Sequence, residues 1–246
     1  MLISAMVGID SRATMDIDTT LRNYPLNCES AEQIVRQIAD VEIDDKISFV
    51  IKKAEEIMED SEYQGVRLSL DAYLDKTRIP LKIDISTGDV ITPCEISFSY
   101  QLMFENRTIP LLAYPPETVL AEKLETILSR GEANTRLRDF YDVYILQRED
   151  FVVTPDALCH ALLATCRTRG HEDLLHTYTS ILDGVRQSGA MRTQWMKYQS
   201  DFDYAAGITW DTVLDTVETL CMKTLDDHAF GDELPQEESQ FEMHLL

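Results

Sequence analysis

Apolar and polar residues alternate along two neighbouring segments in the first half of the chain. In residues 65–74 the apolar positions are Val66, Leu68 and Leu70, and in residues 79–86 they are Leu81, Ile83 and Ile85. A period of two is typical of strands with one buried face. Turn residues at 75–78 and 87–89 bound the second segment. We therefore predict an antiparallel ribbon over 65–86, with Asp84 on its polar face.

The rest of the first 113 residues has a mixed pattern. An apolar, β-branched run predicts a strand over Ala13–Thr20, and Phe49–Ile51 predicts a short one. Between them, Ser30–Ala39 has helical spacing, with Ser30 as its cap and an apolar stripe of Ile34, Val35 and Ile38. The pattern predicts a mixed αβ region.

The pattern becomes helical after Tyr114-Pro115-Pro116, a proline pair that blocks continuation of any preceding element. Amphipathic stretches predict helices over 117–130, 136–147, 155–167, 171–188 and 209–226, the first ending at Gly131. No Gly/Ser linker separates the two regions. We predict three parts: a core over 1–113, a helical region over 114–230 and an acidic, disordered tail over 231–246. The core and the helical region should pack together as one unit.

Composition narrows the class of protein. The chain has 246 residues, of which 44% are hydrophobic, typical of a folded domain. Its five cysteines are scattered and form no CxxC pair, which argues against a zinc site or a disulfide framework. No apolar run is long enough to span a bilayer, and no signal segment is present. We expect a cytoplasmic protein without a membrane partner.

The net charge of −22 is unusual for a protein that handles nucleic acid, because Lys and Arg hold phosphate backbones. An RNA substrate would need a local basic patch. The candidates are Arg130, Arg136, Arg138, Arg148, Arg167 and Arg169. The alternative is that these arginines are solvated charges on helix faces.

Asp16 and Asp18 are the first candidates for chemistry. In a strand, positions i and i+2 project from the same face, so the two carboxylates would converge. Converging carboxylates repel each other unless a cation lies between them, and Mg²⁺ that holds a nucleoside triphosphate is a common cation of this kind. The alternative is solvated charge on an exposed strand.

Charged residues also lie on or beside apolar helix faces. Lys123 lies between Leu120 and Ile127 on the apolar stripe of its helix, where it either reaches solvent or meets an anion such as a phosphate. Asp139 and Asp142 share a face of the next helix, and Arg138 is spaced to pair with Asp142.

Taken together, the segments RATMDIDTT, LKIDISTGD and YPPETVLAEKLETILSRGEANTRLRDFYDVYIL resemble the AbiEii family of nucleotidyltransferase toxins over residues 3–146. The AEKL segment followed by DFYD carries most of the likeness. The resemblance implies an α+β fold, with a DNA polymerase β-like nucleotidyltransferase core containing a mixed sheet and a helical C-terminal region.

The resemblance also implies roles for individual residues. Asp16, Asp18 and Asp84 would bind catalytic Mg²⁺ or Mn²⁺, and Lys123 would contact the triphosphate. Arg12 and Thr14 would help to position phosphates, and either Asp139 or Asp142 would be an essential aspartate. The partners implied are a nucleoside triphosphate, an RNA acceptor such as a tRNA 3′ end, and a cognate antitoxin, with a role in growth arrest during phage defence.

One departure leaves an alternative open. The Gly-Gly or Gly-Ser turn with which the superfamily cradles the triphosphate would lie upstream of Met1, so the core is expected to be N-terminally truncated. The alternative function is therefore a catalytically impaired binding or regulatory module that keeps the fold. A phosphohydrolase is disfavoured because all five histidines lie after residue 159.

Overall fold

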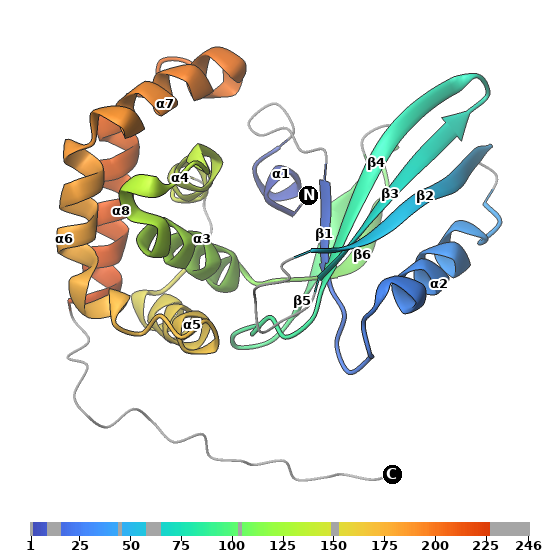
Figure 1. Cartoon of the computed structure of the whole chain (residues 1–246), viewed down its shortest axis with the longest axis horizontal. Coiled ribbons are helices and arrows are strands. Elements are labelled where there is room, and N and C mark those ends of the chain that lie inside the picture. The colour runs from blue at the N-terminus through green and yellow to red at the C-terminus, as the bar shows by residue number, and fades with distance from the viewer. Residues whose placement is uncertain are drawn as a thin grey trace, which may run out of the picture.

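Four strands form a mixed sheet in the order β1-β4-β3-β2 (Figure 1). The computed structural model describes residues 2–8, 16–43, 46–57, 65–102, 105–148 and 153–226. The strands are β1 (Asp16–Thr20), β2 (Ile47–Ile57), β3 (Gly65–Leu74) and β4 (Thr77–Ser86). β1 runs parallel to β4, and the other pairs are antiparallel. The ribbon predicted over 65–86 is confirmed.

Helix α2 (Cys28–Ala39) covers one face of this sheet. Ala31 and Val35 pack against Val66, Leu68 and other apolar side chains of that face. Two details of the predicted helix are wrong. Its N-cap is Asn27, whose side chain accepts from the backbone N–H of Ser30 at 2.8 Å, and Ile38 is 66% exposed rather than part of the buried stripe.

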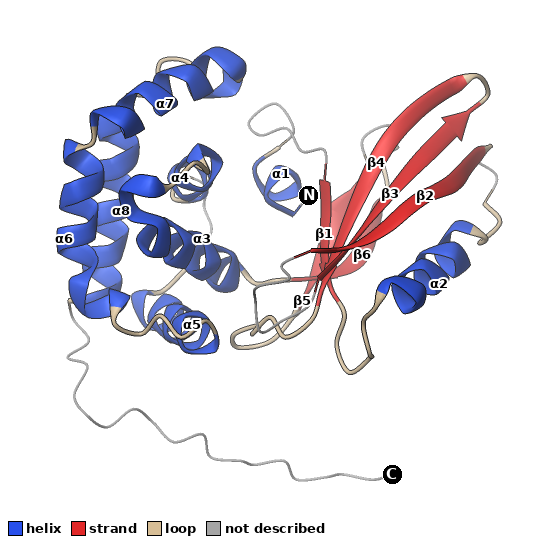
Figure 2. Cartoon of the chain, in the orientation of Figure 1, coloured by secondary structure: helices blue, strands red, loops and turns tan. Residues whose placement is uncertain are grey.

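Helices fill the second half of the chain and lie together on the other side of the molecule (Figure 2). They are α3 (Pro116–Arg130), α4 (Leu137–Leu146), α5 (Pro155–Thr168), α6 (Leu174–Gln187), α7 (Gly189–Asp201) and α8 (Trp210–Leu225). Their apolar side chains form the larger of the two hydrophobic cores. The N-terminal helix α1 (Leu2–Val7) also adds Ile3 and Val7 to this core, although it precedes the sheet.

Five elements are longer than predicted or were not predicted. β2 extends over eleven residues, and a separate two-stranded sheet is made by β5 (Ile96–Gln101) and β6 (Thr108–Ala113). Helices α1 and α7 were also not predicted. Helix α1 and strand β6 have only six residues each, so few apolar positions repeat in them, whereas Ile96, Phe98 and Tyr100 alternate regularly with polar residues in β5. The boundary at residue 113 stays a prediction.

Three further expectations concern membrane-spanning helices, the cysteines and the acidic C-terminal segment. None of the helices in the described ranges is long and apolar enough to cross a membrane. All five cysteines are free, and Cys159, Cys166 and Cys221 are buried. The acidic segment 231–246 lies outside the described residues.

Candidate active site

The sheet face opposite α2 carries a row of charged positions across three strands. Asp18 of β1 is in register with Asp84 of β4, and Asp84 is in register with Arg67 of β3. Neighbouring strands are about 4.8 Å apart, and residues in register project from the same face. Asp16 is two positions before Asp18 and shares its backbone face. The register therefore places Asp84 on the strand next to Asp18, as the family resemblance implied.

Arg67 holds Asp84 in a two-pronged ion pair. Its Nε donates to Asp84 Oδ1 at 2.7 Å, and its Nη2 donates to Oδ2 at 2.6 Å. This geometry matches the planar guanidinium to the planar carboxylate and makes the pair stronger than a single hydrogen bond. Sequence reasoning missed Arg67, although its place in the alternation of β3 puts it on the polar face.

Lys123 of α3 reaches both aspartates of α4. Its Nζ donates to Asp139 Oδ1 at 2.6 Å and lies 3.4 Å from Asp142 Oδ2. Arg136 Nε lies 2.9 Å from the other oxygen of Asp139. Both carboxylates are buried, with at most 2% of the side chain exposed, whereas 18% of Lys123 is exposed. Lys123 therefore does meet anions, and in this structure they are the two aspartates.

A cavity of about 500 Å³ lies between β1, α3, α4 and α7. Its charged and amide-bearing lining residues are Asp18, Lys123, Arg136, Arg138, Asp139, Gln194, Lys197 and Asp201. Among these charges, four cations face three carboxylates, in a chain whose net charge is −22. The cavity therefore gathers four cationic side chains around one space, where an anion could bind.

Helix α7 supplies a wall of this cavity that the sequence did not predict. Gln194, Lys197 and Asp201 lie three or four residues apart, so they share one face of the helix. The buried residues Met191, Trp195 and Tyr198 follow the same helical spacing on a neighbouring face. That spacing is the signal that could have revealed α7.

A polar network continues the site beyond the carboxylate row. Thr20 is in register with Ser86, and its hydroxyl donates to Asp89 Oδ2 at 2.7 Å. The phenol of Tyr114 donates to the same oxygen at 3.1 Å. Glu122 of α3 interacts electrostatically with Asp89 and with Asp18, and burial together with the charge of Asp89 raises its pKa to about 7.

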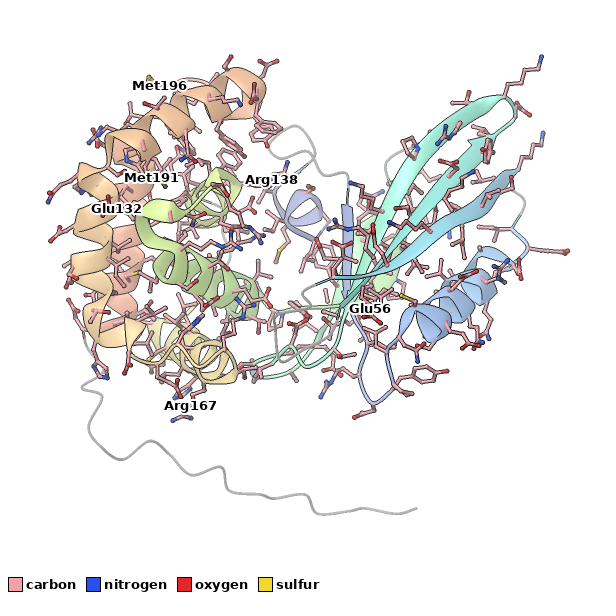
Figure 3. All side chains as sticks on the ribbon, viewed as in Figure 1. Glu56, Glu132, Arg138, Arg167, Met191 and Met196 are labelled. Carbon is pink, nitrogen blue, oxygen red and sulfur yellow. The ribbon has the colours of Figure 1, made fainter. Side chains whose placement is uncertain are left out.

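The six candidate arginines do not form one basic surface, which favours the alternative of separate charges on helix faces. Arg138 lies on the side of the helices nearest to α1, whereas Arg167 lies at the far end of α5 (Figure 3). Arg169 pairs with the buried carboxylate of Glu125, and the Arg148 guanidinium lies 5.4 Å from the centre of the Tyr144 ring. Only Arg136 and Arg138 of the six line the cavity, within the described residues.

Other predicted site residues are only partly described. Arg12 and Thr14 lie outside the described residues, and Asp16 is placed by its backbone alone. Among described side chains, no group of three or more His, Cys, Asp or Glu converges to hold a metal. The donor set nevertheless fits Mg²⁺ or Mn²⁺, because Asp18 and Asp84 present hard carboxylate oxygens at paired positions of adjacent strands.

This chain is similar to one protein family and to a solved structure. The model of the family described as nucleotidyl transferase AbiEii toxin, type IV toxin–antitoxin system, matches residues 1–216. The crystal structure of a provisionally assigned nucleotidyltransferase from H. pylori is similar with a TM-score of 0.43 and 11% identity, over 93% of this chain and 87% of that chain. No curated protein is significantly similar in sequence.

Proposed function

Because the chain belongs to the AbiEii family of nucleotidyl transferase toxins, we propose that it moves a nucleoside monophosphate from a nucleoside triphosphate onto the 3′ end of a tRNA. Membership makes the chain a nucleotidyltransferase of a type IV toxin–antitoxin system. The metal, the triphosphate, the tRNA acceptor and the role in phage defence are parts of the proposal.

The observation that carries the proposal is the cavity bordered by Asp18 and lined by four cationic side chains. A triphosphate is a polyanion, and Lys123, Arg136, Arg138 and Lys197 supply cations around one space of about 500 Å³. That volume lies within the range typical of small-molecule sites. Asp18 at its edge brings the row of carboxylates next to the place where the phosphates would lie.

Asp16, Asp18 and Asp84 would hold the divalent cation at this edge. When bound, Mg²⁺ or Mn²⁺ supplies a Lewis acid that activates the attacking hydroxyl and neutralises charge on the phosphoryl group. The strands would contribute position, because the register of β1 and β4 pairs the backbones of Asp18 and Asp84. Such preorganisation reduces the reorganisation needed during the reaction.

Lys123 and Arg136 would stabilise the leaving pyrophosphate. Both cations line the cavity, and both now contact Asp139. Asp139 therefore orients the two cations toward the cavity that it also lines, while Asp142 is fully buried behind it. On this basis we assign the role of the essential aspartate to Asp139, as a positioning residue.

A second candidate function has an observation in its favour. Lys123 is neutralised by two carboxylates and Asp84 by Arg67, so both groups have protein partners without any substrate. This would suit a catalytically impaired binding or regulatory module. A cognate antitoxin is implied by the family in either case.

The test is nucleotide transfer by the full chain. We would incubate it with Mg²⁺ or Mn²⁺, total tRNA and each α-labelled nucleoside triphosphate. The informative variant is Asp18→Asn. The matched control is Asp203→Asn, because Asp203 is an exposed carboxylate that does not line the cavity.

Label on tRNA that is lost in Asp18→Asn and kept in Asp203→Asn is the expected result. Triphosphate binding without transfer to any RNA would favour the regulatory module. Absence of both binding and transfer would overturn the proposed chemistry of this cavity.

A further inference from the structure

Arg67 and Asp84 form a two-pronged ion pair between neighbouring strands. Both carboxylate oxygens accept a hydrogen bond, at 2.7 and 2.6 Å. The side chain of Asp84 is 20% exposed, and that of Arg67 is 37% exposed. The pair is thus partly shielded from water but not sealed, so a small cation has access to it.

Arg67 lies on the strand next to Asp84, at the paired position in the sheet. The register places Arg67 beside Asp84, and Asp84 beside Asp18, in one row across β3, β4 and β1. Two strand spacings, or about 10 Å, therefore separate the backbones of Arg67 and Asp18. A long guanidinium side chain that already contacts Asp84 is closer still to any ion that Asp84 would hold.

The guanidinium and a divalent cation have the same sign and share a ligand. In the structure Arg67 supplies a positive charge to Asp84, whose backbone is in register with that of Asp18. An ion that binds Asp84 must either displace the Arg67 guanidinium from the carboxylate or stay near a like charge. Both alternatives weaken binding of the ion, because like charges repel each other at short range, here in a site that is partly shielded from water.

We propose that Arg67 is the counter-ion of Asp84 while no divalent cation is bound, and that its charge lowers the affinity of the site for that cation. This inference rests on the proposed function, since it takes Asp84 as a metal ligand. It assigns Arg67 a positioning role that neither the sequence motifs nor the family description includes.

The experiment measures Mn²⁺ binding to the full chain by the loss of the free Mn²⁺ signal in electron paramagnetic resonance. Arg67→Gln removes the positive charge. Arg67→Lys keeps the charge but removes the two-pronged hydrogen bonding of the guanidinium. The matched control is Arg78→Gln, because Arg78 forms a similar pair with Asp71, 2.8 Å from Nε to Oδ1, between the same two strands. Asp71 is four residues from Arg67 along β3, or about 13 Å.

We expect Arg67→Gln to bind Mn²⁺ about tenfold more tightly than the wild type, the effect of removing one like charge near the ion. Arg67→Lys should stay within about threefold of the wild type, and Arg78→Gln should be unchanged. Should Arg67→Gln not fold, the wild type still gives an answer. In this second experiment the wild-type chain is titrated with diamagnetic Mg²⁺ in place of Mn²⁺. The resonance of the Arg67 Nε–H group in the nuclear magnetic resonance spectrum should shift as Mg²⁺ binds.

Two outcomes would overturn the inference. Unchanged or weaker Mn²⁺ binding in Arg67→Gln would show that the charge does not oppose the ion, and an Arg67 resonance insensitive to Mg²⁺ would show the same in the wild type. Asp84→Asn separates this failure from failure of the proposed function. If Asp84→Asn leaves the Mn²⁺ affinity unchanged, Asp84 is not a metal ligand, and the proposed metal site is refuted.

Discussion

Replacement of Lys123 by Met should destabilise the fold, whatever the role of Lys123 in catalysis. Lys123 Nζ is 2.6 Å from Asp139 and 3.4 Å from Asp142, and both carboxylates are almost completely buried. Met has nearly the same length as Lys, so the change removes the charge and keeps most of the packing. Two buried carboxylates would then lose their shared cation.

The magnitude follows from the partners that remain. Breaking a buried ion pair by removing one partner costs about 3–5 kcal/mol. Arg136 still contacts Asp139, and Lys123 is itself 18% exposed, so we expect the lower end of this range. A loss of about 3 kcal/mol lowers Tm by roughly 6–12 °C for a chain of this size.

The assay is urea denaturation in a metal-free buffer, followed by tryptophan fluorescence. Trp195 and Trp210 are both buried in the helical core, so their emission reports its unfolding. Lys223→Met is the matched control, because Lys223 is an exposed lysine on α8. Adding Asp142→Asn to Lys123→Met should restore part of the lost stability. A loss below about 1 kcal/mol in Lys123→Met would refute the argument that Lys123 neutralises buried carboxylates.

Three further predictions concern other parts of the chain. Because the pKa of Glu122 is raised to about 7 in the fold, its contribution to stability is complete below about pH 4.5 and is lost as the pH rises through 7. Glu122→Gln should therefore remove about 2 kcal/mol of the decline in unfolding free energy between pH 5 and pH 8, and an unchanged decline would contradict this cause. In α2, Val35→Ala should cost about 2 kcal/mol by urea denaturation and Ile38→Ser less than about 0.5, and equal costs would contradict the observed helix face. Lys197→Gln should weaken triphosphate binding about threefold in calorimetry while Lys223→Gln does not, and equal affinities would exclude Lys197 from the site.

Local periodicity determined the elements that carry most of the proposed chemistry. The alternation in residues 65–86 predicted the paired strands β3 and β4 because a half-buried strand repeats every two residues. The apolar stripes of α3 and α4 were likewise readable, as was Gly131 at the end of α3, where φ is +47°. The same reading missed β5, β6 and α7, although Ile96, Phe98 and Tyr100 alternate in β5 and the buried residues of α7 follow helical spacing.

The sequence by itself determined which residue types are present at the site: paired aspartates on a strand, a lysine on an apolar helix face, and two aspartates on the next helix. It also carried the motifs on which the family resemblance depends. Those properties are local, since they depend on spacing along a few turns or one strand.

Only the tertiary structure decided which charges meet. Strand register brought Arg67 to Asp84, and packing of α3 on α4 brought Lys123 between Asp139 and Asp142. The fold also set α7 against the cavity and separated the arginines that had looked like one patch. Such contacts join residues that are distant in the chain, and their energies depend on burial and distance, which no local spacing encodes.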